Sequence, residues 1–312
     1  MHPILLIPHY NRRDLLDRVL QALKQQTADH QTLVIDNGST DGSVELAEKS
    51  GVQVLPLDRN YGFAYAVNRG IEWALHQRAS HIGIVNNDVV PSPTWLEELL
   101  RSEASFACGK IVSEANPTVL DGTFDLISST GLSFRSGNGQ SASHPTYQQL
   151  IRISSAPMTA VVFRREVFET IGLLDESYGS YLEDVDFGIR CALANIQGEY
   201  LPVALATHRG NATLGAWHPE TIRLISRNQV LLLAKHYPGK WIWSYGCSAV
   251  VGQLLWGIAV IRQVRDVHIF GVKKRAFSFG RACGKSAAMR FVLSSGDRQK
   301  NFITMHPGGF KR

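Results

Sequence analysis

Short apolar runs alternate with stretches of helical periodicity through the first third of the chain. The apolar runs predict buried strands at residues 3–8, 31–35, 52–57 and 81–85. Between them, apolar side chains recur every three or four positions, which predicts helices at residues 12–26, from Ser43 onward, at 63–76 and at 93–102. Strands and helices alternating at such short intervals are typical of a parallel sheet covered by helices on both faces. We therefore expect an α/β fold.

Polar residues follow three of these predicted strands at the point where each strand ends. The three pairs are Tyr10 with Asn11, Asp36 with Asn37, and Asn87 with Asp88. Each pair alone is typical of a turn. In open α/β sheets, however, ligands bind beyond the carboxyl ends of the strands. Three polar pairs at one edge of the sheet therefore predict a binding site.

The kind of ligand at this edge is limited by the motifs that the chain lacks. No GxGxxG follows the first strand and no GxxxxGK[ST] occurs, which excludes a dinucleotide fingerprint and a P-loop. Asp88, with Asn87 beside it, offers the hard oxygen atoms that suit Mg²⁺ or Mn²⁺. An Asn-Asp turn without a metal is the alternative interpretation of the same residues.

The pattern loosens at residues 107–154, where glycines separate short β-like pieces. Residues 136–143 form a small polar stretch that we expect to be a mobile loop, either closing over a ligand or lying on the surface. A strand at residues 160–163 and a helix at 165–171 are predicted next.

Residues 180–190 contain the densest group of acids in the chain. Glu183, Asp184 and Asp186 fall within four positions at the start of a predicted helix. Like charges at this spacing repel one another, although the helix dipole favours negative charge at an N-terminus. Asp186 and Arg190 lie four positions apart and suit an ion pair that fixes the helix start. The acids therefore either interact with the dipole at the helix end or act in catalysis.

Composition indicates an ordinary globular protein in a reducing compartment. The chain has 312 residues, of which 44% are hydrophobic. Its four cysteines are scattered without a CxxC pair, which argues against a disulfide framework or a structural zinc. The first residues lack the pattern of a signal peptide, so we expect a cytoplasmic location.

Charge and hydrophobicity change near the C-terminus. Residues 262–312 contain 12 basic and 2 acidic side chains, a local net charge of 12 − 2 = +10. They follow an uncharged stretch at residues 241–261, which is just long enough to span a bilayer. A spanning helix would leave the basic tail outside, against the positive-inside rule. We expect interfacial contact with anionic lipid, or alternatively a helix buried on the preceding domain. The predicted domains are 1–236 and 237–312.

An ordered set of motifs resembles a known family. IDNGSTDGS, NYGFAYAVNRGI, NNDV and GLLDESYGSYLEDVDFGIR follow an initial strand that ends in a Tyr-Asn-Arg turn. Across residues 3–236 this order resembles family-2 glycosyltransferases, and most resembles the bacterial rhamnosyltransferase-like members that build cell-surface polysaccharide. The resemblance implies a GT-A fold, which is a Rossmann-like, mostly parallel sheet flanked by helices. The C-terminal extension would be helical and associated with a membrane.

The resemblance also implies roles for particular residues. Asp184 would be the base of an inverting transfer, with Glu183 as the competing candidate. Asp88 and His208 would bind Mg²⁺ or Mn²⁺, although a lone histidine is as often structural. The nucleotide would contact residues near the strand ends: Pro8, Tyr10, Asp36, Asn37, Asn60, Gly62, Asn68 and Asn87. Of these, Asn68 has a solvated helix position as its alternative. Pro8-His9 departs from the Thr or Ser that is common before this tyrosine, which leaves the base identity open.

These roles imply an enzyme that transfers a sugar, with dTDP-rhamnose as the donor suggested by the resemblance. The acceptor would be a saccharide or a lipid-linked saccharide, at the inner face of the cell membrane. A sugar nucleotidyltransferase is the first alternative, but the turn after the first strand lacks the glycines that it needs. A non-catalytic nucleotide-binding protein is the second. The basic tail carries no recognised nucleic-acid motif, so no nucleic-acid partner is expected.

Overall fold

The computed structural model describes residues 2–128, 132–210 and 218–237, together with short pieces at 239, 246–247, 250–252, 254, 257–258 and 302–303. The described residues form two compact units. The first contains residues 2–125 and 135–210. The second contains the described residues between 126 and 134 and between 218 and 303.

The first unit is organised around one sheet, which has ten strands among the described residues. Its main path runs β10-β12-β6-β11-β4-β1-β2-β3, with β5 paired to β12 and β7 paired to β6. The strands are β1 (Pro3–His9), β2 (Gln31–Asp36), β3 (Gln53–Pro56), β4 (His81–Val85), β5 (Val89–Pro91), β6 (Phe106–Ser113), β7 (Asn116–Gly122), β10 (Ile151–Ile153), β11 (Ala160–Arg164) and β12 (Gly198–His208).

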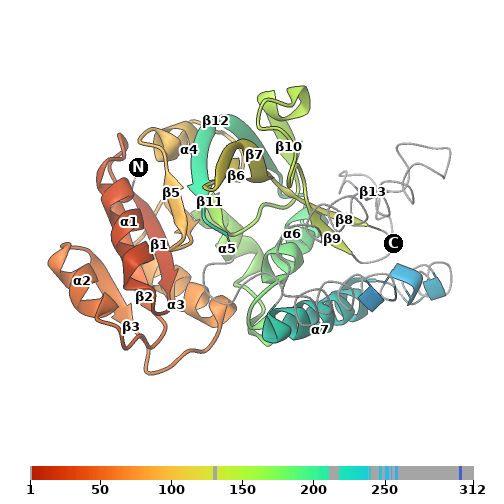
Figure 1. Ribbon diagram of the computed structural model, residues 1–312, viewed down its shortest axis with the longest axis horizontal. Coiled ribbons are helices and arrows are strands. Elements are labelled where there is room, and N and C mark those ends of the chain that lie inside the picture. Colours follow the sequence, from red (N-terminus) through yellow and green to blue (C-terminus); the bar gives the residue numbers. More distant parts are fainter. Residues whose placement is uncertain are drawn as a thin grey trace, which may run out of the picture. The chain divides into compact units, whose positions relative to one another are not determined.

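Helices connect these strands and cover both faces of the sheet (Figure 1). The α-helices are α1 (Arg13–Lys24), α2 (Ser43–Lys49), α3 (Phe63–His76), α4 (Trp95–Leu100), α5 (Arg165–Ile171) and α6 (Glu183–Leu193). Two short 3₁₀ helices are η1 (Pro145–Gln148) and η2 (Glu176–Tyr178).

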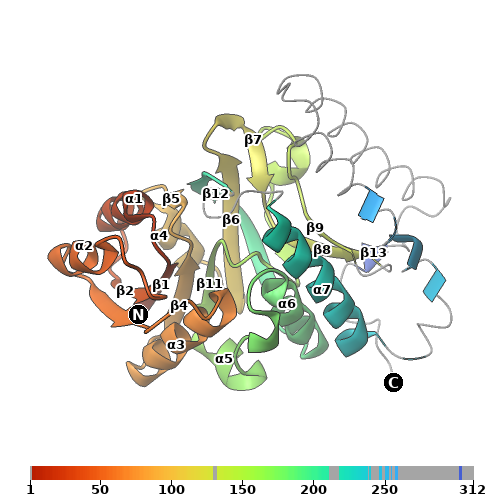
Figure 2. The same ribbon diagram turned by 60° about the horizontal axis from the view of Figure 1, so that its bottom comes forward.

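Strand β1 shows why the sheet is covered on both sides. Its residues are apolar throughout, and alternate side chains point to opposite faces. Ile4 and Leu6 belong to one apolar cluster, with residues of α3, α5 and α6. Leu5 and Ile7 belong to a second cluster, with residues of α1, α2 and α4. Figure 2 shows these two groups of helices on the two sides of the sheet.

The parallel arrangement expected from the sequence is found in one half of the sheet. Strand β1 pairs in parallel with β2 and β4, and β2 pairs in parallel with β3. The register places His9 opposite Asp36, so the ends of β1 and β2 meet at one edge. The other half is mixed, with β11 antiparallel to β4 and β6 while β12 is parallel to β6. Overall, the fold class expected from the sequence is confirmed.

Strand β6 was not predicted as one long strand, because the hydrophobic pattern of residues 107–154 is irregular. It is almost wholly buried and contains Gly109 in its middle. A Cβ at Gly109 would lie 1.9 Å from the carbonyl oxygen of Ala204, so the approach of β12 requires glycine there. Helix α4 is also shorter than the predicted 93–102, because Trp95 donates its backbone N–H to Ser92 in a turn that precedes the helix.

The second unit contains α7 (Pro219–His236) and the short strands β8 (Asp125–Ser128), β9 (Ser133–Arg135) and β13 (Phe302–Ile303). The first residue of β8 and the last residue of β9 belong to the first unit. Tyr237 after α7 donates its hydroxyl to the backbone oxygen of Ser128 at 2.8 Å. Of the helices in the described part of the chain, none is long and apolar enough to cross a membrane. Most of the stretch at 241–261 and of the basic tail lies outside the described residues, and the domain boundary at residue 236 stays a prediction.

Candidate active site

Strand pairing brings Asp88 and His208 together, although 119 positions lie between them in the sequence. Asp88 immediately precedes β5, and Val89 of β5 pairs with His208 at the end of β12. The backbone N–H of Arg209 also donates to the backbone oxygen of Asp88 at 3.0 Å. As a result, Asp88 Oδ2 lies 3.2 Å from His208 Nε2, with the two side chains 12% and 11% exposed.

A second carboxylate, Asp121 of β7, faces the other nitrogen of the same imidazole. Asp121 Oδ2 lies 2.8 Å from His208 Nδ1. Burial by itself would lower the pKa of His208, but the hydrogen bonds to Asp121 and Asp88 outweigh it and raise the pKa to about 9. His208 is therefore tied to two carboxylates at once. Asp121 belongs to no motif, so sequence analysis did not identify it.

The donor atoms of Asp88 and His208 fit a divalent cation. Within the described residues, no group of three or more His, Cys, Asp or Glu side chains forms a complete metal shell. Mg²⁺ is commonly held by one or two protein ligands, with phosphate and water oxygens at the remaining octahedral positions. Mn²⁺ accepts carboxylate ligands in the same way. One carboxylate beside one imidazole nitrogen meets that requirement when the substrate supplies phosphate oxygens.

The crowded acids at the start of α6 have separate environments. Asp186 is fully buried, and Arg190 donates its Nε–H to Asp186 Oδ2 at 3.0 Å. The same guanidinium donates to the backbone oxygens of Ile171 and Leu173 at 2.8 and 2.7 Å. The ion pair predicted from the sequence is confirmed, and it holds α6 against the end of α5.

Glu183 and Asp184 differ in exposure and in ionisation. Glu183 is 6% exposed, and its Oε2 has no hydrogen-bond partner in the described structure. Burial and the neighbouring Asp184 raise the pKa of Glu183 well above its ordinary value. Asp184 is only half-buried, and its Oδ1 accepts the backbone N–H of Val185 at 2.8 Å. Burial also raises the pKa of Asp184, but Arg135 opposes the shift by favouring the ionised form.

Arg135 lies among carboxylates of both parts of the site. Its Nη1 is 3.5 Å from Asp121 Oδ2, on the side of His208. Asp125 is the third carboxylate near Arg135: burial and Asp184 raise the pKa of Asp125 to about 8, while Arg135 opposes that rise. A Cβ on Gly122 would lie 2.0 Å from Arg135 Cδ, so the stem of Arg135 crosses the strand where there is no side chain. Sequence analysis did not identify Arg135 or Asp125. It treated the glycines of this region, Gly122 among them, only as separators of short strands.

The ends of β1 and β2 form a polar group beside Asn87. Asp36 is buried; its Oδ2 accepts the backbone N–H of Ser39 at 3.0 Å, and its Oδ1 has no partner among the described residues. Asn87 donates its side-chain N–H to His9 Nδ1 at 2.9 Å, which leaves His9 Nε2–H to donate to Ser43 Oγ at 2.8 Å. Burial lowers the pKa of His9 to about 4, although Asp36 and Asp41 oppose the shift. His9 is therefore neutral and braces Asn87.

Two of the predicted nucleotide residues brace the loop before α3. Asn37 donates its side-chain N–H to Asn60 Oδ1 and to the backbone oxygen of Gly62, both at 3.1 Å. It also accepts the backbone N–H of Tyr61 at 2.9 Å. Both ends of the Asn37 amide are thus used within the protein.

Asn68 is likewise a bracing residue. It is buried, so it is not the solvated helix residue that was its alternative. Its amide donates to the backbone oxygen of Leu174 and to Glu176 Oε1, and it accepts the backbone N–H of Leu174, each at 2.9 Å. Pro8 and Tyr10 remain partly exposed at the sheet edge. Contact of these residues with a nucleotide stays a prediction.

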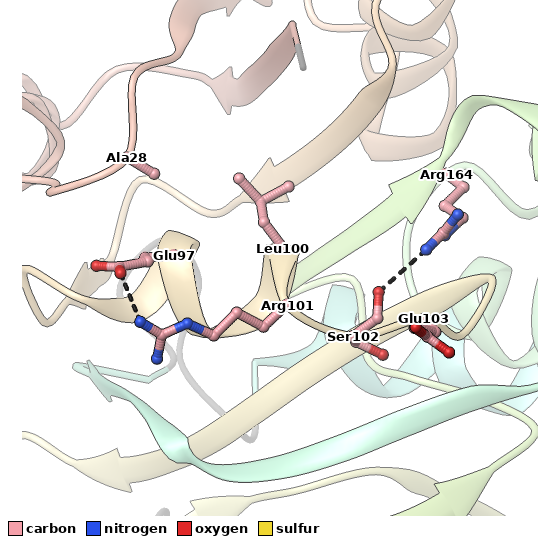
Figure 3. Close-up of a pocket in the computed structure, with 7 residues that line it drawn as sticks. All are labelled: Ala28, Glu97, Leu100, Arg101, Ser102, Glu103 and Arg164. Carbon is pink, nitrogen blue, oxygen red and sulfur yellow. Dashed lines mark hydrogen bonds and ion pairs between the residues drawn. The ribbon is translucent and has the colours of Figure 1, made fainter.

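A cavity elsewhere in this unit has a different character (Figure 3). Its volume is about 450 Å³, and it is lined by Ala28, Glu97, Leu100, Arg101, Ser102, Glu103 and Arg164. Arg101 pairs with Glu97 at 2.6 Å, and Arg164 donates to the backbone oxygen of Ser102 at 3.2 Å. Arg164 is opposite His81 at the beginning of β4, whereas the polar turn at Asn87 follows the end of that strand. The cavity is therefore at the opposite edge of the sheet from the predicted site.

Comparisons with known proteins agree with this geometry. The model of glycosyl transferase family 2 matches residues 4–172, which is more than half of the chain. An N-acetylglucosaminyl-diphospho-decaprenol L-rhamnosyltransferase of Mycobacterium tuberculosis is 26% identical over 252 residues, covering 72% of this chain and 82% of that protein. The O-antigen biosynthesis protein RfbC of Myxococcus xanthus is 27% identical over 210 residues, covering 62% of this chain and 16% of that protein.

Two solved structures share the fold at low sequence identity. GalNAc-T7, crystallised with UDP, GalNAc and Mn²⁺, has a TM-score of 0.57 and 15% identity, and the match covers 74% of this chain and 48% of that one. The mannosyltransferase PcManGT of Pyrobaculum calidifontis, in complex with GDP-Man and Mn²⁺, has a TM-score of 0.52 and 13% identity, covering 95% and 87%. This chain thus spans about half the length of GalNAc-T7. The protein belongs to glycosyltransferase family 2 and is a glycosyltransferase of the GT-A fold that transfers sugar from a nucleotide-sugar donor.

Proposed function

We propose that this enzyme inverts the anomeric centre as it transfers a sugar from a nucleoside diphosphate to a hydroxyl of a saccharide or lipid-linked saccharide. The observation that carries the proposal is the position of Arg135. It links the carboxylate beside His208 with the carboxylates beside Asp184. A group suited to hold a diphosphate through a cation and a group suited to take a proton are therefore close in one site. The mycobacterial relative supports rhamnose, and hence dTDP-rhamnose, as the donor.

Asp184 is the proposed general base. It takes the proton from the acceptor hydroxyl as the hydroxyl oxygen attacks the anomeric carbon, and the bond to the diphosphate breaks. Asp184 is less buried than Glu183, which makes it the more accessible of the two to an acceptor, and Arg135 favours its ionised form. Glu183 is the weaker candidate because burial and Asp184 raise its pKa well above the ordinary value, which disfavours the carboxylate form that a base requires.

Asp88 and His208 are the residues that would hold Mg²⁺ or Mn²⁺. Their oxygen and nitrogen atoms meet at 3.2 Å at the end of β12. When bound there, the cation supplies electrostatic stabilisation of the charge that develops on the departing diphosphate. The presence of Mn²⁺ with nucleotides in the two solved relatives supports this proposal.

The ends of β1 and β2 are the proposed nucleotide-binding part of the site. The buried Asp36 Oδ1 has no partner among the described residues and is suited to accept an N–H of the nucleotide base. Pro8 and Tyr10 precede and follow His9, the residue opposite Asp36 in the sheet, and both are at least partly exposed. Asn37, Asn60 and Gly62 act on this pocket by fixing the loop that borders it.

The kind of acceptor indicates where in the cell the enzyme acts. Because the mycobacterial relative is named for a decaprenol-linked substrate, we propose an acceptor carried on a membrane lipid. The net charge of +10 in residues 262–312 favours contact with anionic lipid at the inner face of the membrane. The enzyme would then meet its acceptor at the cytoplasmic surface of the cell membrane.

The proposal is tested by incubating the full chain with Mn²⁺ and a panel of dTDP-, UDP- and GDP-sugars and assaying nucleoside diphosphate release with a lipid-linked acceptor. We expect Asp184→Asn to bind the nucleotide as the native chain does but to lose roughly 10²–10⁴-fold in turnover. Glu183→Gln should retain substantial turnover. Equal turnover of Asp184→Asn and the native chain would refute the base assignment, and release of pyrophosphate instead would indicate a nucleotidyltransferase.

A further inference from the structure

The imidazole of His208 lies between two carboxylates that contact different nitrogens. Asp88 faces Nε2 and Asp121 faces Nδ1. We propose that Asp121 is a positioning residue: by accepting the Nδ1–H of His208, it fixes the tautomer and ring orientation that present Nε2 to a divalent cation beside Asp88. This inference rests on the proposed metal site and adds to it a residue that binds neither cation nor substrate.

The position of Asp121 results from an irregularity in β7. Strand β7 pairs with β6, with Gly122 opposite Ile111 and Leu120 opposite Val112. Asp121 is therefore an extra residue in β7, at a β-bulge between two paired positions. Such bulges redirect a side chain and are frequent beside active sites. His208 pairs with Ser113 on the other edge of the same β6 strand. The bulge thus brings a carboxylate to the histidine across one strand.

Contacts on both sides of Asp121 hold its carboxylate in place. Arg135 Nη1 lies 3.5 Å from Asp121 Oδ2, the oxygen that also faces His208. Asn138 donates its side-chain N–H to the backbone oxygen of Asp121 at 2.6 Å, which fixes the bulge itself. The Arg135 guanidinium and the His208 ring thus face the same carboxylate oxygen, which is placed to accept the Nδ1–H.

The chemistry of histidine explains why the second carboxylate matters. A neutral imidazole has one N–H and one lone pair, and either nitrogen can carry the hydrogen. Only the tautomer with hydrogen on Nδ1 leaves the Nε2 lone pair for a cation. Metal-binding histidines commonly donate their other N–H to a carboxylate or carbonyl, and loss of that partner typically weakens metal affinity about 10–100-fold.

A purely electrostatic role is the competing explanation. Removing Asp121 also removes a negative charge near the cation, which would weaken binding without any effect on the tautomer. Glu114 provides a matched control because it is another carboxylate close enough to interact electrostatically with Asp88, while its side chain pairs with Arg18 and has no contact with the His208 ring. Glu114→Gln therefore removes a neighbouring charge without removing a hydrogen bond to the imidazole.

The test measures Mn²⁺ binding to the full chain by electron paramagnetic resonance of the free ion, with Mn²⁺ as the only added ligand. We expect Asp88→Asn to abolish binding and Asp121→Ala to weaken it about 10–100-fold, with Glu114→Gln within about twofold of the native chain. In the Mg²⁺-saturated protein, ¹⁵N NMR should show hydrogen on His208 Nδ1 in the native chain. In the Asp121→Ala variant that hydrogen should exchange faster with solvent, because its acceptor is gone, and circular dichroism identifies any variant that has not folded.

Different outcomes separate this inference from the metal proposal. If the native chain does not bind Mn²⁺, or binds it equally with Asp88→Asn, the metal site is refuted and the role of Asp121 with it. If Asp88→Asn abolishes binding but Asp121→Ala leaves both the affinity and the protection of the Nδ1 hydrogen unchanged, only the role of Asp121 is refuted. Equal losses in Asp121→Ala and Glu114→Gln would likewise assign the effect to charge alone. Asp121→Asn serves where Asp121→Ala does not fold: it keeps an acceptor oxygen and removes the charge, so it should keep the Nδ1 hydrogen protected and the affinity near native, and loss of both would refute the positioning role.

Discussion

At the scale of residues, two buried histidines of the site have pKa values shifted in opposite directions when no cation is bound. Burial lowers the pKa of His9 to about 4, whereas two carboxylates raise that of His208 to about 9 against the same effect. The difference comes from the neighbours. The ring of His9 contacts an amide and a hydroxyl, which suit a neutral imidazole, and His208 contacts Asp88 and Asp121. One residue type thus serves as a neutral brace in one place and as a partner of charged groups in another.

The ionisation of His9 predicts a loss of stability in acid. Its pKa is about 4 in the folded protein against 6.5 when unfolded, so the unfolded chain binds more protons between these values. The stability is fully present above pH 6.5 and is lost as pH falls toward 4. Between pH 7.5 and pH 4.5 we expect the native chain to lose about 2.5 kcal/mol more than His9→Gln. Urea unfolding at the two pH values measures this difference, and parallel losses in both proteins would contradict it.

At the scale of elements, the orientation of helix α6 depends on one buried ion pair. Arg190 contacts Asp186 and two backbone oxygens at the end of α5. Just before the helix, Tyr181 and Leu182 have φ values of 73° and 67°, a backbone conformation that is costly for residues other than glycine. Packing must therefore hold the turn from which Glu183 and Asp184 emerge, and the ion pair is part of that packing.

Removing Arg190 should destabilise the fold. Arg190→Gln leaves the fully buried Asp186 without its cation, and we expect a loss of about 3–5 kcal/mol in the free energy of unfolding. Arg101→Gln at the end of α4 is the matched control, because Arg101 also pairs with acids three and four positions away but is 62% exposed. That variant should lose less than about 1 kcal/mol. Chemical denaturation measures the free energy of unfolding of both variants. Similar losses in the two would argue against the bracing role of Arg190.

Hydrophobic periodicity predicted best the helices that pack one regular apolar side on the sheet. Helices α3 and α5 have the predicted bounds, because regular helical spacing places their apolar sides on the sheet. Strands β6 and β7 were obscure for physical reasons. Gly109 is required by the approach of Ala204, and the extra residue Asp121 breaks the two-residue alternation of a strand. Both irregularities depend on contacts with residues that are distant in the sequence. The spacing of apolar residues along the chain does not reveal such contacts.

At the scale of the whole molecule, the site combines residues that the sequence could name with residues that it could not. Asp88, His208 and Asp184 were named because family motifs surround them. The pairing of β5 with β12 brings the first two together, as expected for metal ligands. Asp121, Asp125 and Arg135 lie in the irregular region and are near the site only because strands far apart in sequence meet there. Sequence motifs therefore pointed to the proposed reacting groups, whereas the residues beside them emerged only from the structure.

The charge asymmetry of the molecule leads to a prediction about membranes. We expect the full chain to float with vesicles containing phosphatidylglycerol, but not with neutral vesicles or at high salt. Neutralising Lys273, Lys274 and Arg275 to glutamine should weaken binding by roughly 3 kcal/mol, at about 1 kcal/mol for each charge near the surface. Glutamine at Lys24, Lys49 and Arg101 of the first unit is the control of equal charge. Equal effects of the two triple variants would show that net charge, rather than the tail, determines binding.

The contact between Gly62 and Gly179 places a constraint on how this enzyme can vary. A Cβ on Gly62 would lie 3.0 Å from the backbone oxygen of Gly179, and Ala64 donates its backbone N–H to that same oxygen at 2.8 Å. The loop that borders the proposed donor pocket therefore meets the turn before Asp184 closely, through these main-chain atoms and through Ser180 Oγ, which accepts the backbone N–H of Phe63 at 3.1 Å. Natural variation in donor or acceptor preference would have to arise elsewhere than at Gly62, because any larger residue there would separate the two loops.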